Sequence, residues 1–209
     1  MELSPLQIAS LLVLVLYLVA FFAGSALAAR AAGQSIWLFG TATGRDRVAA
    51  FGFRAGFALA VIGPVVWVAV PGMSAADPLW SAGLALMALP GHVLAVAGAM
   101  LAFAAQMAMG ASWRVGVKAD AVGALVSEGL YSFSRNPTFL GQAALLAGVA
   151  LAVPSVPGLL AVVLFIASAN AQIRSEEDAL KMSHGKAYEI FRDRTPRWLG
   201  RPKQSGPEI

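Results

Sequence analysis

Two polar segments of this sequence hold most of the side chains that could do chemistry. The first ends at Arg135 and Asn136, directly before an apolar stretch, and the second begins at Arg174 and contains the adjacent acids Glu176 and Glu177. A guanidinium can hold an anionic group, and a carboxylate can hold a cationic one, through charge-assisted hydrogen bonds. We therefore expect a functional site to be built from residues 110–136 together with the residues that follow Ile173.

The first segment also has a purely structural interpretation. Asn136 can cap a helix, Pro137 suits the first helical position, and Arg135 suits a membrane interface. That interpretation leaves Gly141 unexplained, since it lies on the same helix face as Pro137. A missing side chain there allows either a ligand or a neighbouring backbone to approach closely.

The second segment, residues 173–194, has the pattern of an amphipathic helix that lies against the membrane face. Its apolar positions at helical spacing are Ile173, Leu180, Ala187 and Phe191. Glu177 and His184 fall on the same face, which brings an acid and an imidazole toward the apolar side. Gly185 can divide the segment into two short helices, with Tyr188 turned back toward the membrane.

Composition shows which elements must position these groups. Of the 209 residues, 58% are hydrophobic and 12% are charged, against about 45–50% and about 25% in soluble domains. This excess predicts an all-α membrane protein. Cysteine is absent and only two histidines are present, so we expect no disulfide, no cysteine nucleophile and no metal site.

Five apolar segments are candidates for membrane-spanning helices, since a span needs about 20 mainly apolar residues. They are residues 5–29, 51–70, a part of 79–109, 137–153 and 156–172. Pro90 is expected to kink the third span. Pro154 and Ser155 alone separate the last two, which indicates a helical hairpin.

The basic residues are distributed on one side of this layout. Four Lys or Arg lie between the end of the first span and the first turn of the second, three between the third and fourth spans, and eight after the fifth, which accounts for all 15. The positive-inside rule then places the N-terminus outside and the C-terminus in the cytoplasm. It also explains the net charge of +4 without nucleic acid as a partner. A cleaved signal peptide ending near Ala26-Leu27-Ala28 is the alternative, but Glu2 and Arg30 oppose it.

Two motif blocks together resemble a known family. They comprise Gly129-Leu130-Tyr131 with the run from Arg135 to Gly141, and then Arg174, Glu176-Glu177, Leu180, Gly185, Tyr188 and Arg197. At this spacing the chain resembles the integral-membrane methyltransferases of the isoprenylcysteine carboxyl methyltransferase and phospholipid N-methyltransferase type. The resemblance covers approximately residues 110–199, whereas the first two spans carry no signature.

The resemblance implies S-adenosylmethionine as the cofactor, held between the last two spans and the C-terminal segment. It implies catalytic roles for Arg135 and Asn136. The implied cofactor-binding residues are Tyr131, Asn136, Pro137, Gly141, Arg174, Glu176, Glu177 and Tyr188. Trp113, Arg114 and Arg197 are candidates for holding an anionic substrate group or a lipid phosphate, with ordinary interface anchoring as the alternative.

Departures from the family pattern weaken the prediction of the methyl acceptor more than the prediction of the cofactor. Asn136 stands where the carboxyl methyltransferases usually have His, Leu130 replaces a frequent Pro, and His184 replaces a frequent Phe. The acceptor is expected to be a lipophilic small molecule with a carboxylate, amine or thiol. Its identity and the oligomeric state stay open.

Two other function classes remain. A membrane reductase that uses NADPH has a similar C-terminal half, although no Gly-x-Gly-x-x-Gly turn follows a strand here. A small transporter or scaffold would need polar residues at mid-membrane, where only His92 and Gln142 qualify. We expect the N-terminal spans in residues 1–78, a catalytic core in 79–201 and a disordered tail in 202–209.

Overall fold

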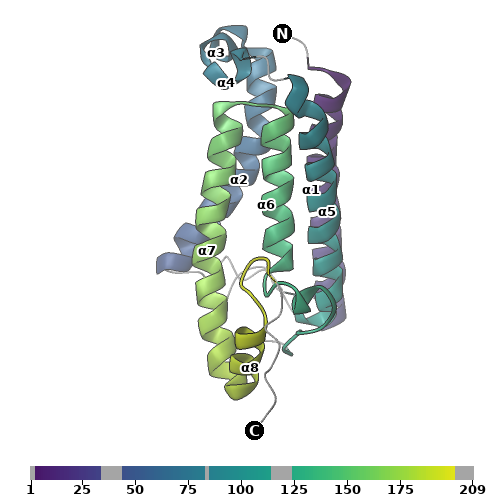
Figure 1. Ribbon diagram of the computed structural model, residues 1–209, viewed down its shortest axis with the longest axis vertical. Coiled ribbons are helices and arrows are strands. Elements are labelled where there is room, and N and C mark those ends of the chain that lie inside the picture. The colour runs from purple at the N-terminus through teal and green to yellow at the C-terminus, as the bar shows by residue number, and fades with distance from the viewer. Residues whose placement is uncertain (1–2, 34–43, 83–84, 114–123, 201–209) are drawn as a thin grey trace.

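The computed structural model describes residues 3–33, 44–82, 85–113 and 124–200, and within these ranges every regular element is a helix. Long helices run side by side along the molecule, and the two termini lie at opposite ends (Figure 1). The long helices are α1 (Pro5–Ala32), α2 (Gly44–Ala69), α5 (Ala88–Met109), α6 (Pro137–Ala152) and α7 (Val156–His184). The protein is therefore an all-α membrane protein, as predicted.

Four of these helices, α1, α2, α5 and α7, are long and apolar enough to cross a membrane, and α6 is a shorter apolar helix. With 16 residues, α6 is about 24 Å long, against a hydrocarbon thickness of about 30 Å. Its length is limited by Pro137 in its first turn and by the break before Ser155, which caps α7. Four of the five predicted spans thus coincide with helices that are long enough to cross a membrane, whereas the fourth, residues 137–153, coincides with the shorter helix α6.

Short elements connect the long helices. They are α3 (Pro71–Ala76), α4 (Pro78–Ser81), η2 (Ala85–Met87), η3 (Gly110–Ser112), η5 (Gly129–Ser132) and α8 (Lys186–Arg194). At the end of the bundle near the N-terminus, the buried Asp77 joins three of the helices. Its carboxylate accepts hydrogen bonds from the backbone of Leu79 (2.8 Å), from Trp67 Nε1 (2.8 Å) and from the backbone of Val156 (2.7 Å). Asp77 thus connects α2, α4 and α7.

Glycines bring α5 and α6 into direct backbone contact. A Cβ added at Gly98 of α5 would lie 2.3 Å from Leu145 N, and one added at Gly141 of α6 would lie 2.4 Å from Ala102 N. Gly91 and Gly148 meet the opposite helix in the same way, at a spacing of seven residues along each helix. This close approach is the packing that small residues permit between helices in lipid, where backbones must supply the contact.

Two predicted features of the spans are corrected. The third span begins as a helix at Ala88, so Pro90 lies in its first turn and does not kink it, because a first-turn proline removes no helical hydrogen bond. The proline inside a long helix is Pro64 of α2. Helix α2 also begins at Gly44, seven residues before the predicted start of the second span.

The amphipathic segment predicted over residues 173–194 is not a separate element. Helix α7 continues from Val156 through Ile173 to His184, because no glycine or proline interrupts it after Gly158. The predicted break at Gly185 is confirmed: this residue has φ +50° and separates α7 from α8. The charged end of α7 and all of α8 extend beyond the apolar part of the bundle.

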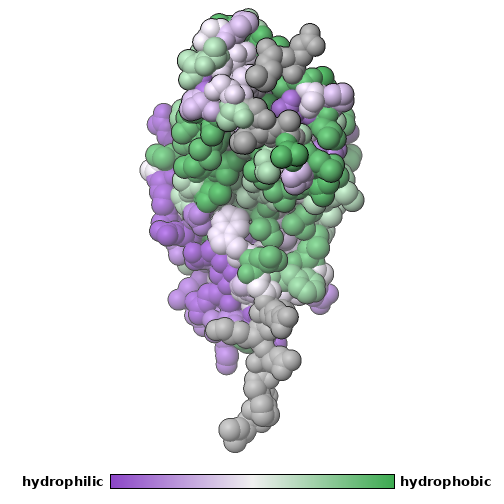
Figure 2. Space-filling view, turned by 45° about the horizontal axis from the view of Figure 1, so that its top comes forward, coloured by the Kyte–Doolittle hydropathy of each residue, from purple (hydrophilic) through white to green (hydrophobic). Residues whose placement is uncertain are grey.

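Hydrophilic side chains gather toward the end of the molecule that carries the C-terminus, and apolar ones cover much of the remainder of the visible face (Figure 2). Basic residues lie at the end of α1 (Arg30), at the start of α2 (Arg45 and Arg47) and in the last turn of α7 (Lys181). The cytoplasmic assignment of this end stays a prediction. The tail predicted to be disordered lies outside the described residues.

Candidate functional site

A buried ionic cluster lies where α6 begins and α7 ends. The carboxylate of Glu177 accepts a hydrogen bond from Arg135 Nη2 at 2.6 Å and from Arg197 Nε at 3.0 Å, and Arg197 Nη2 approaches its second oxygen. The side chains of Arg135 and Glu177 are only 10% and 15% exposed, whereas that of Arg197 is 39% exposed. One carboxylate therefore pairs with two guanidinium groups that come from distant parts of the chain.

Arg135 also holds the segment that follows α8, residues 195–198, which we name the C-terminal strap. Its Nη1 donates to the carbonyl oxygens of Thr195 (2.6 Å) and Arg192 (3.0 Å), and its backbone N–H donates to the carbonyl of Pro196 (2.9 Å). Charge-assisted bonds of this kind are about twice as strong as neutral ones. Arg135 therefore fixes the strap against the start of α6.

Asn136 continues the same set of contacts. Its side-chain Nδ2 donates to the carbonyl of Arg197 at 2.8 Å, and its backbone N–H donates to Ser134 Oγ at 3.0 Å. No side-chain hydrogen bond caps α6, although Asn136 is the residue that precedes it. The prediction that the Asn136 side chain caps α6 is therefore wrong: its amide donates to the strap, and its role toward a cofactor stays a prediction.

The far end of the strap is attached to α7. Trp198 Nε1 donates to Asn170 Oδ1 at 3.3 Å, and Asn170 Nδ2 donates to the carbonyl of Ile166. The strap therefore crosses from the start of α6 to the face of α7, above the apolar core.

The electrostatics follow from this geometry. The hydrogen bond and the charge of Glu177 raise the pKa of Arg197 above its usual range. Burial raises the pKa of Tyr188 to about 12, and the nearby negative charge of Glu177 adds to this effect. Tyr188 therefore stays protonated and Arg197 stays charged at neutral pH.

Two polar atoms of the cluster are buried without a hydrogen-bond partner among the described residues: Arg135 Nε and Tyr188 Oη. Leaving such groups unpaired costs free energy. Glu176, next to Glu177, is half-buried and accepts a hydrogen bond from Gln172 Nε2 at 3.0 Å. The cluster thus offers a donor, a hydroxyl and a second carboxylate to a bound molecule.

The structure brings together five of the predicted site residues: Arg135, Asn136, Glu177, Tyr188 and Arg197. Tyr131 packs with Tyr188 and Phe191 in one apolar group. Its hydroxyl donates to the carbonyl of Ala105 at 3.2 Å.

Other predicted residues lie elsewhere or serve packing. Trp113 is buried, and its indole N–H donates to Ser25 Oγ at 3.1 Å, so it connects α1 to the end of α5. Gly141 faces α5, and the group that approaches it closely is the backbone of that helix. Its predicted role in binding a cofactor stays a prediction. Arg174 is exposed, Pro137 occupies the first turn of α6, and Arg114 lies outside the described residues.

Sequence reasoning named Arg197 but missed the strap to which it belongs. Thr195 and Pro196 take part through backbone carbonyls, for which side-chain identity gives no signal. Trp198 and Asn170 are 28 positions apart in the sequence and share no motif, so nothing in the sequence indicated that they form a hydrogen bond.

The fold and the cluster define a helical integral membrane protein whose polar site is assembled at one end of the bundle. Residues 86–187 match the family model described as phospholipid methyltransferase. This match confirms the resemblance to membrane methyltransferases of the phospholipid type that the motifs indicate. The matched segment contains Arg135, Asn136 and Glu177, whereas α1, α2 and the strap lie outside it. Comparisons with curated proteins and with solved structures gave no match.

Proposed function

We propose that this protein is an S-adenosylmethionine-dependent methyltransferase that acts on a lipophilic acceptor drawn from the membrane. One observation carries the proposal. Arg135 and Glu177, which belong to separate motif blocks of the segment that matches the family, meet at 2.6 Å in a buried cluster that still has unpaired polar atoms. Arg135 Nε and Tyr188 Oη make no hydrogen bond of normal geometry, but their side chains are close enough for Arg135 to lower the pKa of Tyr188, so both groups face the same point of the cluster.

The residues present fit the proposed cofactor. Arg135 Nε is a donor suited to a carboxylate, and Glu176 is a carboxylate suited to an ammonium group. Tyr188 Oη can either donate or accept. When bound, S-adenosylmethionine supplies a sulfonium methyl group that a nucleophile can displace in line. Arg135, Glu176 and Tyr188 are the residues that would hold it.

The roles of the chain's own residues are binding, positioning and exclusion of water. Glu177 fixes Arg135 and Arg197, and Asn136 fixes the strap, so these groups are held in place before a substrate arrives. Positioning of this kind contributes about 7–11 kcal/mol in well-oriented cases. The strap covers the junction of α6 and α7 and limits the access of water. An acceptor that is already anionic needs no general base, whereas an amine must arrive neutral.

Equilibrium binding tests the proposal most directly. Detergent-purified protein is titrated with S-adenosylmethionine and, separately, with NADPH. The expected result is saturable binding of S-adenosylmethionine alone, together with transfer of a labelled methyl group to a component of a membrane lipid extract. Binding of NADPH alone would replace the proposal with the reductase alternative. Binding of neither would leave a transporter or scaffold.

A pair of neighbouring variants supplies the control. Glu176→Gln removes the half-buried carboxylate proposed to hold the ammonium group, and we expect a loss of about tenfold to a hundredfold in affinity, the equivalent of one charge-assisted bond. Asp178→Asn changes an acid two positions away whose side chain is 74% exposed, and its affinity should equal that of the unmodified protein. Equal affinity in all three proteins would remove Glu176 from the site.

A further inference from the structure

Three consecutive acids at the charged end of α7, Glu176, Glu177 and Asp178, have different partners. Glu177 pairs with two arginines, and Asp178 Oδ2 lies 3.5 Å from Arg45 Nη2. In the part of the chain that the structure describes, Glu176 forms no ion pair, and its Oε1 accepts a hydrogen bond from the neutral amide of Gln172 at 3.0 Å. Glu176 is therefore the acid of this run that has no cation to offset the cost of burying its charge.

The first turn of α2 brings a further carboxylate to this place. Ser175, the residue before Glu176, donates its hydroxyl hydrogen to Asp46 Oδ1 and accepts a hydrogen bond from Arg45 Nη2 at 2.9 Å. Ser175 is 9% exposed, so these contacts fix the start of α2 against α7. The side chain of Arg45 is 53% exposed, and water therefore screens its charge. Arg45 thus offsets the negative charge of Asp46 only in part.

The other groups around Glu176 supply no counter-charge among the described residues. From η5, Tyr131 lies near Glu176, and burial together with that negative charge raises the pKa of Tyr131 to about 12. On α7 itself, Arg174 is exposed and Glu177 is a second negative neighbour. Burial raises the pKa of Glu176 to about 7, and the charges of Asp46 and Glu177 add to this effect. Glu176 therefore takes up a proton far more readily than an ordinary glutamate.

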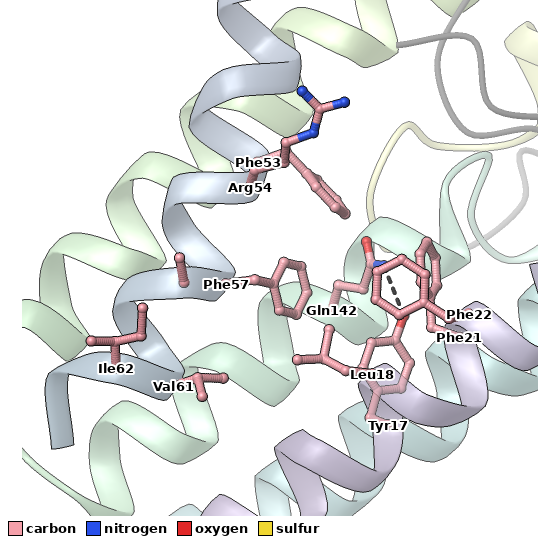
Figure 3. A pocket seen from close by; sticks show the side chains of 11 residues that line it. Tyr17, Leu18, Phe21, Phe22, Phe53, Arg54, Phe57, Val61, Ile62 and Gln142 are labelled. Carbon is pink, nitrogen blue, oxygen red and sulfur yellow. Dashed lines mark hydrogen bonds between the residues drawn. The ribbon is translucent and has the colours of Figure 1, made fainter. Parts of the chain in front are cut away.

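Further along, α2 serves a different part of the bundle. There it lines a cavity of about 300 Å³ that it shares with α1 and α6. The lining includes Tyr17, Phe53, Arg54, Phe57 and Gln142 (Figure 3). Arg54 is the charged member of this lining, whereas Asp46 is the charged group of α2 that affects the pKa of Glu176. The effect of α2 on the acids of α7 therefore comes from its first turn.

We propose that Asp46 is a positioning residue that promotes protonation of Glu176 in the ligand-free protein, so that binding of a cationic group at Glu176 releases a proton. This inference rests on the proposed function, in which the cationic group is the ammonium of S-adenosylmethionine. The proton passes from the Glu176 carboxyl to water, and the ammonium keeps its own protons. The carboxylate that forms can then accept a charge-assisted hydrogen bond, which is about twice as strong as a neutral one.

Infrared spectroscopy of the ligand-free, detergent-purified protein measures this protonation directly. A protonated carboxyl has a C=O stretching band that a carboxylate lacks, and Glu176→Gln identifies the band of Glu176 by its loss. We expect this band to titrate with a midpoint at about pH 7, against about 4.3 for an ordinary glutamate. Asp46→Asn keeps an oxygen that can accept from Ser175 but removes the charge, and it should lower the midpoint by about 0.5–1 pH unit.

Further variants separate the charge of Asp46 from its structural contacts. Asp46→Glu restores the negative charge, so the midpoint should return toward that of the unmodified protein. Asp193→Asn removes an equal charge from α8, where the side chain is 69% exposed, and the midpoint should not change. Melting curves check that each variant is folded. If Asp46→Asn unfolds, Ser175→Ala replaces it: this variant frees Asp46 from α7, and the midpoint should again fall.

Calorimetry measures the release of the proton. S-adenosylmethionine is titrated at pH 6 in two buffers of different ionisation enthalpy, and the difference gives the protons released per molecule bound. At this pH an α-amino group is charged, and a carboxyl that titrates at pH 7 is about nine-tenths protonated. We therefore expect release of about 0.9 proton from the unmodified protein, about 0.5–0.8 from Asp46→Asn and none from Glu176→Gln.

Three results would overturn the inference. A Glu176 midpoint at about pH 4.3 would mean that the carboxyl is already ionised without a ligand. An unchanged midpoint in Asp46→Asn would remove Asp46 from this role, and equal proton release from Glu176→Gln would assign the proton to another group. Absence of S-adenosylmethionine binding would refute the proposed function and the release step with it, whereas the infrared titration would still decide whether Asp46 acts on Glu176.

Discussion

Replacing Glu177 tests whether one carboxylate holds the site together. Glu177→Gln keeps the shape of the side chain and one acceptor oxygen but removes the negative charge that pairs with Arg135 and Arg197. Arg135 would then be a buried cation without a counter-charge, bonded only to carbonyl oxygens of the residues around the strap. We expect the variant to be markedly less stable and the strap to be released.

The magnitude follows from burial. Breaking a buried ion pair by removing one partner costs about 3–5 kcal/mol, and the 10% and 15% exposed side chains of Arg135 and Glu177 form such a pair. The Arg197 side chain is 39% exposed, so water can replace the hydrogen bonds that it loses from Glu177. Its contribution to the lost stability is therefore about 0–1 kcal/mol. Because Arg135 keeps two carbonyl acceptors, the total should lie near the lower limit, at about 3 kcal/mol.

Two assays measure this effect. Reversible unfolding in mixed micelles gives the free energy of unfolding, and limited trypsin digestion reports release of the strap through cleavage after Arg194 and Arg197. Asp178→Asn is the matched control, since an exposed acid contributes at most about 1 kcal/mol. A double variant, Arg135→Met with Glu177→Leu, should recover part of the loss because it removes both charges. If Glu177→Gln and Asp178→Asn gave the same small loss and the same digestion rate, the cluster would not hold the strap.

Three further perturbations address the rest of the structure. Asn136→Asp cannot donate to the carbonyl of Arg197 when ionised, so we expect a loss of about 1–3 kcal/mol and faster tryptic release of the strap, whereas a mere helix cap would tolerate Asp. Gly141→Ala places a Cβ 2.4 Å from a backbone nitrogen of α5 and should lower stability by about 1–3 kcal/mol, while Gly72→Ala, with nothing within 4 Å, should not in the same melting assay. Burial alone would raise the pKa of Asp77, but the hydrogen bonds that its carboxylate accepts outweigh burial, so folding lowers this pKa. The ionised carboxylate therefore stabilises the fold fully above the unfolded pKa of about 3.9, and this stabilisation is lost as the pH falls through the folded value. Asp77→Asn should melt earlier than the unmodified protein at pH 7, and this difference should shrink at about pH 3.

The spans were predictable because lipid imposes a simple requirement on composition and length. Their ends were less so. Arg45, Asp46 and Arg47 indicate a loop by charge alone, yet they form the first turn of α2, where Ser175 of α7 donates to Asp46 and accepts from Arg45. The charged end of α7 likewise stays helical because α8 and the strap pack against it. These tertiary contacts decide helix ends, and a local pattern does not contain them.

The site was predictable in its residue types and not in its contacts. The family resemblance selected Arg135, Asn136 and Glu177, and the structure brings them together. It could not indicate that Glu177 is occupied by two guanidinium groups, because Arg197 lies 20 positions further along the chain. The cavity was equally hidden, since Gln142 appeared in the sequence only as an isolated polar residue within a span.

The boundaries of the family match divide the molecule into parts with different physical tasks. Residues 86–187 contain the glycine-packed pair α5 and α6 together with α7, and this rigid unit fixes Arg135 relative to Glu177. The aromatic cavity instead takes most of its wall from α1 and α2, outside the match, and only Gln142 from within it. Under the proposed function, Arg135 and Glu177 are thus held by the shared unit, while the charge of Asp46 and most of the cavity wall are supplied by the N-terminal helices.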